Sequence, residues 1–314
     1  MLVLNMEDTR KALAWPLLIE ALESMFKSGC VMPVRHHHDL QVPGENDATL
    51  LLMPAWVPGS YMGVKMVSVF PDNSKRSLPA IFGTYLLSSA KTGEMLAVID
   101  GGELTARRTA AASALAAKYL ARQDASSLLV VGTGRLSLNL MQAHAQVRPI
   151  THFHVWGRNP SSTATTVEEA RALGLNAHAA INLEDAARNA DIISCATLSN
   201  DPLIKGEWLK QGAHLDLVGA FKPTMRECDD EAAKRATIFV DTFDGALKEG
   251  GDIVQPLESG AIVRRDIVAE LADLVTKRHV GRSDDKQITL FKSVGAALED
   301  LAGAIQAYES ATAK

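Results

Sequence analysis

The stretch from Leu128 to Ser137 constrains the fold of this 314-residue chain more than any other segment. The apolar run from Leu128 to Val131 is typical of a strand buried on both faces. Gly132 and Gly134 follow at once, and Ser137 opens a segment with helical periodicity. A strand, a glycine-rich turn and a helix N-terminus form the context in which a dinucleotide pyrophosphate binds, because free N–H groups at the helix start attract its charge. The stretch therefore predicts a dinucleotide site, although a strand-to-helix turn without a ligand has the same outline.

Each small residue of this turn has a separate expected role. Gly132 permits the tight turn, and Gly134 lets the backbone approach the pyrophosphate. Ser137 replaces a third glycine and is small enough for close packing of the helix on the strand.

Composition places the chain among ordinary globular proteins and excludes several classes. Hydrophobic residues make up 47% of the sequence and charged residues 22%. A net charge of −5 without a basic run gives no basis for nucleic-acid binding. Cys30, Cys195 and Cys228 are too far apart for a disulfide framework or a zinc motif. No apolar stretch approaches the ~20 residues of a membrane span and no signal-like segment opens the sequence, so we expect a cytoplasmic protein without a membrane partner.

The first part of the chain is predicted to combine helices with a mostly antiparallel sheet. A helix over 8–27 is interrupted near Pro16, and an alanine-rich helix covers 103–120. Between these helices lies a run of strand-like segments. The expected strands are Val31–Leu40, Ala48–Trp56, Tyr61–Phe70, Ile81–Ser89 and Glu94–Ile99.

From about 128 to 241, strands alternate with helices, which is typical of a doubly wound parallel sheet. After this part we expect one more helix and a terminal helix whose apolar residues step by three and four from Val294. The expected strands are Leu128–Val131, His152–Trp156, Ala177–Ala179, Asp191–Ala196, His214–Val218 and Ile238–Val240. The expected helices are Ser137–Val147, Pro160–Leu173, Leu183–Asn189, Glu227–Arg235 and Val263–Lys277.

The segment after the second strand of this sheet bears on the choice between NAD and NADP. An NAD enzyme usually carries an acid about 20 residues past the glycine turn, to bind the ribose hydroxyls. Here Gly157 is followed by Arg158 and Asn159, with no acid. Arg158, helped by Asn159 and the hydroxyls of Ser161 or Ser162, suits a 2′-phosphate, so NADP is favoured. Asn159 before a proline is also an ordinary helix N-cap.

Two further strand ends are expected beside the coenzyme, because ligands of open parallel sheets lie beyond the carboxyl ends of the strands. Thr197 and Leu198 follow one of these strands. Val218, Gly219 and Ala220 follow the next.

Three cations in apolar surroundings are candidates for binding a substrate carboxylate. Arg35 follows Met-Pro-Val, and Lys65 occupies one face of an otherwise apolar strand. Arg108 shares a helix face with Leu104 and Leu115, whereas Arg107 does not. A charge in a core-facing row is costly unless it is paired. Each cation alone fits an ordinary ion pair or a surface residue, and their recurrence is what favours a carboxylate clamp.

Two other features are interpreted as structural. His36 and His38 share a strand face, but no further ligand completes a metal site, so no metal is expected. Cys195 lies in an apolar strand and fits a core residue better than a nucleophile.

Ordered segments along nearly the whole chain resemble one protein family. The segments are Met-Pro-Val-Arg35, Gly-Val-Lys65-Met-Val-Ser-Val-Phe-Pro-Asp-Asn73, Leu-Thr-Ala-Arg-Arg108-Thr-Ala, Val-Gly-Thr-Gly134, Pro-Leu-Ile-Lys-Gly-Glu-Trp-Leu-Lys-Gln-Gly-Ala213, Phe-Val-Asp241 and Phe-Lys-Ser-Val-Gly-Ala-Ala-Leu-Glu-Asp300. At this spacing they resemble the ornithine cyclodeaminase/mu-crystallin family.

The resemblance implies an α/β fold in two domains and a homodimer. Residues 1–120 with 291–314 would form a substrate-binding domain whose mostly antiparallel sheet is used for dimerisation. Residues 121–290 would form the Rossmann domain. Arg35, Lys65 and Arg108 would hold the substrate carboxylate.

The resemblance also implies residues near the coenzyme. Thr84, Ser293 and Val294 would lie near the nicotinamide, with Val294 also at the substrate. Arg135 and Leu136 stand where the family has a Gln-containing turn, and we expect them at the coenzyme phosphates. In mu-crystallin-like members a Trp-Asn-Arg-Thr stretch binds NADPH, and the segment that ends in Arg158-Asn159 looks similar.

One departure from the family bears on the reaction. Ornithine cyclodeaminases carry a catalytic Asp shortly after the Val-Gly at the end of this strand, and the segment 218–223 here has none. The leading hypothesis is therefore an NADPH-dependent reductase of cyclic α-imino acids such as pyrroline-2-carboxylate or piperideine-2-carboxylate. The proton source stays open between Lys65 and a water, with Asp241 and Glu249 as weaker candidates.

Three alternatives remain. One is an ornithine cyclodeaminase with tightly held NAD, and another is an alanine-dehydrogenase-like enzyme that uses the same clamp. The third is a binding protein of mu-crystallin type that retains NADPH and a small carboxylate ligand.

Overall fold

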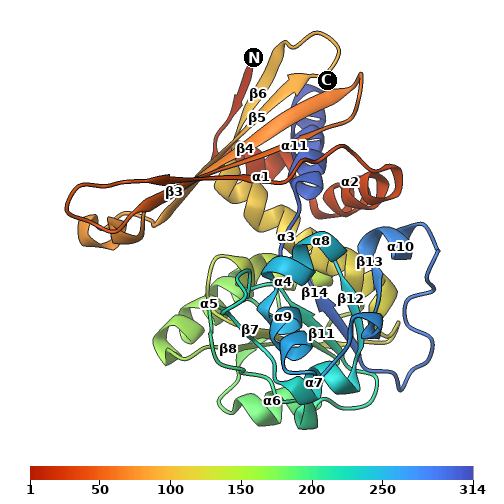
Figure 1. Cartoon of the computed structure of the whole chain (residues 1–314). Coiled ribbons are helices and arrows are strands. Elements are labelled where there is room, and N and C mark those ends of the chain that lie inside the picture. The colour runs from red at the N-terminus through yellow and green to blue at the C-terminus, as the bar shows by residue number, and fades with distance from the viewer. Residues whose placement is uncertain (314) are drawn as a thin grey trace. The chain divides into compact units, whose positions relative to one another are not determined.

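The computed structural model describes residues 1–313, which form two compact units (Figure 1). Unit 1 contains residues 1–108 together with the chain from Ala297 onward, and unit 2 contains residues 109–296. The boundaries predicted from sequence lay at 120 and 291. The difference at the first boundary arises because α3 (Gly101–Leu120) is one continuous helix that contributes to both units.

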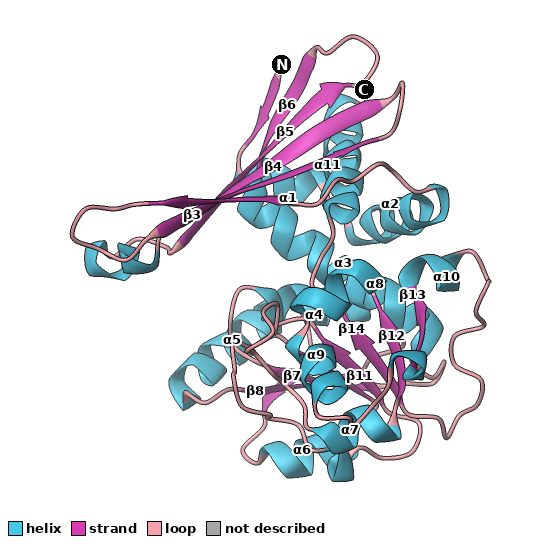
Figure 2. Cartoon of the chain, in the orientation of Figure 1, coloured by secondary structure: helices cyan, strands magenta, loops and turns pink. Residues whose placement is uncertain are grey.

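Unit 1 is built on a mixed sheet with the strand order β1-β6-β5-β4-β3-β2. Only β1 runs parallel to its neighbour within the described residues; the other pairs are antiparallel hairpin partners. The terminal helix packs on β3, β4, β5 and β6 and against α2 (Figure 2). The elements are β1 (Leu2–Leu4), α1 (Met6–Ala12), α2 (Trp15–Ser28), β2 (His36–Leu40), β3 (Ala48–Trp56), β4 (Tyr61–Val69), β5 (Ile81–Ser89), β6 (Met95–Asp100) and α11 (Ala297–Thr312).

Alternation along β4 decides which side chains of unit 1 enter the core. Gly63 and Lys65 are buried, whereas Met62 and Met66 are exposed. Because successive side chains of a strand point to opposite faces, β4 presents Lys65 to the buried face of the sheet. Tyr85 lies directly opposite Lys65 on β5 and is fully buried.

Unit 2 is a doubly wound sheet whose strands are all parallel in the described part of the chain, in the order β13-β12-β14-β11-β10-β7-β8-β9. The chain proceeds from β7 to β8 on one side and then returns to β10 on the other, so the topological switch lies between β7 and β10. The strands are β7 (Ser127–Val131), β8 (His152–Trp156), β9 (Ala177–Ala179), β10 (Ile192–Cys195), β11 (His214–Leu217), β12 (Thr237–Val240), β13 (Ile267–Glu270) and β14 (Thr289–Lys292). The helices are α4 (Leu136–His144), α5 (Pro160–Ala172), α6 (Leu183–Asn189), α7 (Asp230–Arg235), α8 (Phe243–Glu249), α9 (Gly251–Glu258) and α10 (Leu271–Val275).

The predicted α/β class, with a Rossmann sheet and a second, mostly antiparallel sheet, is confirmed. The predicted helix over Val263–Lys277 is wrong, because this segment contains β13 and only the short helix α10. Ile267 and Ala269 are buried and alternate with exposed Val268, which is the period of a strand. The Asp273 carboxylate accepts the Glu270 N–H at 3.1 Å and so stabilises the separate start of helix α10. Two short elements were therefore mistaken for one helix.

Several elements of unit 2 and the edge strand β1 were not predicted. β14 lies in the middle of the sheet, between β11 and β12, and is buried along its whole length. Its four residues include Thr289 and Lys292, and a strand this short with two polar residues gives little periodicity. Helix α7 begins three residues later than expected, at Asp230, because Asp229 caps it through the Ala232 N–H at 2.9 Å.

Candidate functional site

The glycine turn after β7 can accept only glycine at its first position. Gly132 has a φ of +124°, a conformation that side chains rarely adopt. A Cβ there would lie 2.7 Å from the Ala196 carbonyl oxygen, so this turn touches the end of β10. The Ser137 hydroxyl donates to the Gly132 carbonyl at 2.9 Å and closes the turn. Ser137 thus supports the turn, beyond the close packing predicted from its size.

The second glycine and the helix start fit a pyrophosphate. A Cβ on Gly134 would meet no atom within 4 Å, so the backbone there is open to a ligand. Helix α4 follows with Arg135 at its N-cap position, and no side chain caps its first N–H groups. Uncapped N–H groups at a helix start bind anions, and Leu136 provides the first of this helix. The local geometry is that of a dinucleotide site.

The turn after β8 lies beside the glycine turn, since a Cβ on Gly157 would come within 2.6 Å of the Thr133 methyl group. Arg158 is exposed there. The Asn159 side chain accepts the Ser161 N–H at 2.9 Å and the Ser162 N–H at 3.4 Å, so it acts as the N-cap of α5. Arg158 and the serine hydroxyls are the groups that this turn offers to a phosphate.

A buried carboxylate that the sequence reasoning missed joins the two strand ends expected at the coenzyme. Glu227 is fully buried. Its Oε1 accepts the Thr197 N–H at 2.6 Å and the Thr197 hydroxyl at 2.8 Å. Its Oε2 accepts the N–H groups of Gly219 at 2.8 Å and Ala220 at 3.2 Å. Glu227 therefore fixes the loops after β10 and β11 relative to each other.

The same edge of the sheet contains a second set of buried carboxylates. Asp252 accepts the Glu227 N–H at 2.7 Å and pairs with the Lys292 ammonium at 2.8 Å, and all three side chains are fully buried. Asp241 accepts the Ser293 hydroxyl at 2.9 Å and the Val294 N–H at 2.8 Å. The carboxyl ends of β10, β11, β12 and β14 are thereby held by buried hydrogen bonds, which makes this edge rigid.

In unit 1, one carboxylate of the terminal helix connects two of the predicted cations. Asp300 accepts from Arg108 Nε at 2.8 Å and pairs with Lys65 Nζ at 2.6 Å. Glu299 accepts from Arg108 Nη1 at 2.5 Å. Lys65 and Arg108 are 3% and 5% exposed, and both acids are fully buried. An ammonium has three N–H donors and a guanidinium has five, so both cations keep donors for a ligand carboxylate.

The pKa values in this cluster follow from burial and from its charges. Burial lowers the pKa of Lys65 to about 8; Arg108 and Arg35 act in the same direction, and Asp300 opposes them. Burial also lowers the pKa of Arg108, but Asp300 and Glu299 outweigh it and the net shift is upward. Arg35 precedes β2, is half-buried and lies close enough to act on Lys65. Asp300 thus joins Lys65 and Arg108, and the charge of Arg35 also acts on Lys65; the binding of a substrate carboxylate by these three cations stays a prediction.

Two other residues of unit 1 lie outside the cation cluster, and the predicted place of Thr84 near the nicotinamide stays a prediction. Arg107 donates to the Leu13 carbonyl at 2.8 Å and stacks 3.9 Å from the Trp15 ring centre, so it ties α1 to α2. Thr84 is paired with Met66, and its side chain therefore lies on the opposite face of the sheet from Lys65. The structure does not bring Thr84 to the cation cluster.

The acids that complete both sets of contacts carried a sequence signal that was not used. Glu299 and Asp300 stand between Leu298 and Leu301 in an apolar helix, and Lys292 ends the strand β14 after Leu290 and Phe291. A buried charge is costly unless it is paired, so buried acids and buried cations are expected to form ion pairs. An acid in an apolar row therefore indicates a buried ion pair as much as a cation in such a row does.

Three other features were considered from the sequence: a metal site, a membrane span and a reactive cysteine. Residues 1–313 contain no group of three His, Cys, Asp or Glu side chains placed to hold a metal ion. No helix in that range is long and apolar enough to cross a membrane. Cys195 is fully buried, and burial raises the pKa of its thiol, so it is a core residue as predicted.

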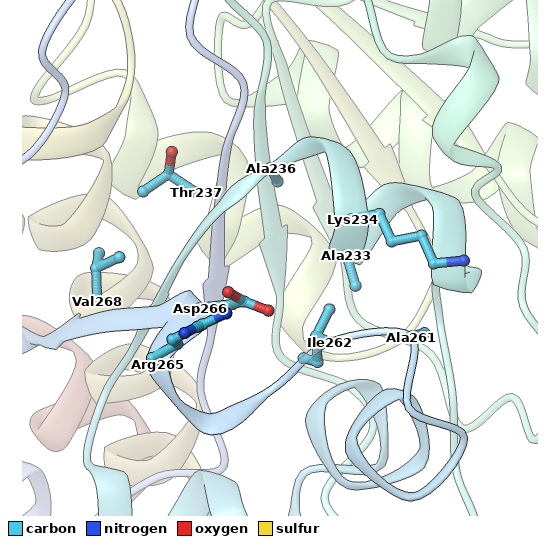
Figure 3. Close-up of a pocket in the computed structure, with 9 residues that line it drawn as sticks. All are labelled: Ala233, Lys234, Ala236, Thr237, Ala261, Ile262, Arg265, Asp266 and Val268. Atoms are coloured by element: carbon cyan, nitrogen blue, oxygen red, sulfur yellow. The ribbon is translucent and has the colours of Figure 1, made fainter.

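A cavity of about 350 Å³ lies in unit 2, at the amino end of β12 (Figure 3). Thr237, the first residue of β12, and Val268 of β13 line it together with Lys234, Arg265 and Asp266. Coenzymes of parallel sheets bind at the carboxyl ends of the strands, so this cavity is separate from the dinucleotide site.

The chain has a two-domain fold of the Rossmann type, and the glycine turn of unit 2 has the geometry of a dinucleotide site. The sequence pattern of the ornithine cyclodeaminase/mu-crystallin family matches residues 2–314. The chain belongs to this family, and the predicted membership is confirmed.

Relatives with described activities cover almost the whole chain. A Δ1-pyrroline-2-carboxylate reductase from Colwellia psychrerythraea is 35% identical over 97% of this chain and 97% of its own length. The structure of the Thermococcus litoralis Δ1-pyrroline-2-carboxylate reductase in complex with NADH and L-proline is 35% identical, covers 99% of this chain and 97% of its own, and has a TM-score of 0.91. An archaeal alanine dehydrogenase dimer with bound NAD is 30% identical, covers 99% and 96%, and has a TM-score of 0.89.

Replacement of Glu227 by Gln is expected to weaken coenzyme binding. The amide would turn an NH2 group toward N–H donors of one of the two loops, and an unsatisfied buried donor costs about 1–3 kcal/mol. We expect the Kd for NADH or NADPH to rise about 10- to 100-fold, measured by fluorescence titration. Glu231→Gln changes an exposed acid of α7 and is the matched control. Wild-type affinity in Glu227→Gln would contradict the assignment of these loops to the coenzyme.

The low pKa of Lys65 predicts opposite effects of alkaline pH on activity and on stability. Above about pH 8 the ammonium loses its proton, so kcat/KM for a carboxylate substrate should fall about tenfold per pH unit. The unfolded chain keeps the ordinary lysine pKa of 10.5 and binds the proton more tightly, so the contribution of Lys65 to the free energy of unfolding should rise from about pH 8 to 10.5. In Lys65→Arg the activity loss near pH 8 should disappear, because arginine stays charged. An unchanged pH profile in that variant would remove Lys65 from the site.

Proposed function

We propose that the protein reduces small cyclic α-imino acids, such as pyrroline-2-carboxylate or piperideine-2-carboxylate, with a nicotinamide coenzyme. The observation that carries the proposal is the buried cluster of Lys65 and Arg108, which offers charged donors inside a protein that also has a dinucleotide site. The names of the similar reductases support the same reaction class. The product would be the corresponding cyclic amino acid.

In the proposed reaction the cations hold the substrate while its C=N bond is reduced. Arg35, Lys65 and Arg108 bind the carboxylate through charge-assisted hydrogen bonds and so fix the neighbouring imine carbon. The bound coenzyme supplies the hydride, which adds to that carbon with its electron pair. The imine nitrogen takes one proton, and the C=N double bond becomes a C–N single bond. No oxygen anion develops, so the site needs no oxyanion donor.

Lys65 is the best placed of the candidate proton donors. Its ammonium is buried and has a pKa of about 8, so it holds a proton at neutral pH and releases it at little cost. A water bound at the cluster is the alternative donor. Asp241 is fully buried and accepts hydrogen bonds from residues 293–295, which suits an organising role. Glu249 lies in the last turn of α8 and is half-buried.

The alternatives within the family are separated by an assay with a panel of substrates. Cyclodeamination lacks its catalytic Asp here, since Ala220 and its neighbours carry no acid. We expect oxidation of NADPH or NADH with the cyclic imines to exceed that with pyruvate plus ammonia. Conversion of ornithine to proline without net coenzyme consumption would instead indicate a cyclodeaminase. Tight binding of NADPH without turnover of any imine would indicate a binding protein of mu-crystallin type.

We further propose that NADP is preferred over NAD. Arg158 is exposed directly after β8, where an acid would bind the ribose of NAD, and it can pair with a 2′-phosphate. The similar structures named above contain NADH or NAD, so this preference is a specific property proposed for this chain.

A homodimer through the open face of the unit 1 sheet is also proposed. This face carries Met62 and Met66, which are 37% and 42% exposed, and Val3 of β1, which is 63% exposed. Large exposed apolar side chains on one sheet face are typical of an interaction surface. The archaeal alanine dehydrogenase described above is a dimer of the same fold.

Replacement of Arg158 by Asp should move the coenzyme preference toward NADH. The 2′-phosphate loses a charged partner and gains a repelling one, so the ratio of kcat/KM for NADPH to that for NADH should fall at least 10- to 100-fold. Steady-state kinetics with both coenzymes measures the ratio. Arg265→Asp, at an exposed position by the opposite edge of the sheet, should leave it unchanged. An unchanged ratio in Arg158→Asp would refute the phosphate assignment.

Replacement of Met66 by Asp should dissociate the proposed homodimer. A charge placed on an apolar interface loses its hydration without gaining a partner, at a cost of several kcal/mol. Sedimentation equilibrium should give the mass of one chain for Met66→Asp and of two chains for the wild type. Leu17→Asp changes a side chain of α2 that is 48% exposed and should keep the dimer mass. A wild-type dimer that survives Met66→Asp would place the interface elsewhere.

A further inference from the structure

Asp300 contacts both Lys65 and Arg108, two of the buried cations of unit 1. It lies in the first turn of α11 and is fully buried. Its Oδ1 accepts from Arg108 Nε at 2.8 Å, and its Oδ2 lies 2.6 Å from Lys65 Nζ. Lys65 comes from β4 and Arg108 from α3, so this one side chain bridges two cations that lie on different elements.

We infer that Asp300 is the positioning residue of the carboxylate-binding cations: it fixes Lys65 and Arg108 relative to each other and keeps Lys65 charged. The inference rests on the proposed function, because it assumes that these cations bind the carboxylate of the substrate. The negative charge of Asp300 would thus favour the binding of a second anion, the substrate carboxylate, because it holds the two cations in place.

The charges around Lys65 explain why Asp300 has this effect. The titratable groups that face the cluster come from α11, α3, the segment before β2, and β5, and they are Asp300, Glu299, Arg108, Arg35 and Tyr85. The β3 partner of Lys65 is the apolar Met53. Burial, Arg108 and Arg35 all lower the pKa of Lys65, and Asp300 raises it. Burial raises the pKa of Tyr85 well above its usual value, so its hydroxyl stays neutral and supplies no charge.

If Asp300 has no positioning role, removal of its charge should change the affinity for a carboxylate ligand in the opposite direction. A carboxylate close to a bound anion repels it, so removing an inert Asp300 charge would strengthen the binding of a carboxylate ligand. If Asp300 positions and charges the cations, its removal weakens that binding instead. The direction of the change therefore separates the two roles.

The test is the pH dependence of pyrrole-2-carboxylate binding to the coenzyme-loaded full-length protein, measured by calorimetry from about pH 5.5 to about pH 9.5. This ligand keeps its negative charge throughout that range, so the pH dependence comes from the protein. For the wild type we expect the affinity to fall above about pH 8. For Asp300→Asn we expect at least a tenfold lower affinity at about pH 7, and a fall that starts about 1–3 pH units lower. Glu299 pairs with Arg108, whereas Asp300 is the acid that raises the pKa of Lys65, so the affinity of Glu299→Gln should still fall near pH 8.

Tighter binding by Asp300→Asn, or an unchanged pH dependence, would overturn the inference. If Asp300→Asn does not fold, the charge-balanced double variant Lys65→Met/Asp300→Asn is compared with Lys65→Met alone. The inference predicts that the double variant binds the ligand more weakly, because Arg108 has lost its anchor. Equal or tighter binding in the double variant would overturn it.

The outcomes also separate this inference from the proposed reaction. If the wild type turns over no imine but Asp300→Asn shows the predicted binding change, the reaction is wrong and the positioning role stands. If the wild type reduces imines but Asp300→Asn binds the ligand as the wild type does, the proposed reaction stands and the positioning role of Asp300 is wrong. Absence of any binding of pyrrole-2-carboxylate by the wild type would refute the carboxylate site and the positioning role together.

Discussion

The pairing of buried charges is the constraint on which unit 1 depends. Lys65 and Arg108 lie in the core, where an unpaired charge would cost several kcal/mol. Asp300 and Glu299 supply the opposite charges from the far end of the sequence. The ion pairs thereby connect the first turn of α11 to β4 and α3. Lys65 and Arg108 can be buried because the C-terminal helix packs on the N-terminal sheet and supplies the acids that pair with them.

Unit 2 uses the same principle at the carboxyl edge of its sheet. Short loops after parallel strands have free N–H groups, and here buried carboxylates accept them. Glu227 joins the loops after β10 and β11, Asp252 pairs with Lys292 at the end of β14, and Asp241 holds the turn at Ser293. Loops fixed in this way are prepared before a ligand binds, so less conformational entropy is lost on binding. Hydrophobic packing forms the sheet, and these acids determine the shape of its edge.

The sequence predicted those features that depend on local patterns. The glycine turn at Gly132, the buried strand before it and the alternation around Lys65 are each visible within ten residues. The partners of the cations were not predicted, because Asp300 lies far from Lys65 in sequence and looks like an ordinary acid at a helix start. Glu227 was expected to begin a helix, but its carboxylate is taken up by two loops and α7 begins later. Acids in apolar rows can be recognised as buried, but the sequence does not show which cation each of them pairs with, so the fold is needed to assign the pairs.

The central claim is that the cations of unit 1 bind the carboxylate of an imino acid that is then reduced. The most direct test compares kcat/KM for pyrroline-2-carboxylate with that for its carboxamide, which has the same ring and C=N bond but no negative charge. Two or three charge-assisted hydrogen bonds of about 1.5–3 kcal/mol each would be lost or weakened. The account predicts that kcat/KM falls by at least about 100-fold for the carboxamide. Equal values for the two substrates would contradict it.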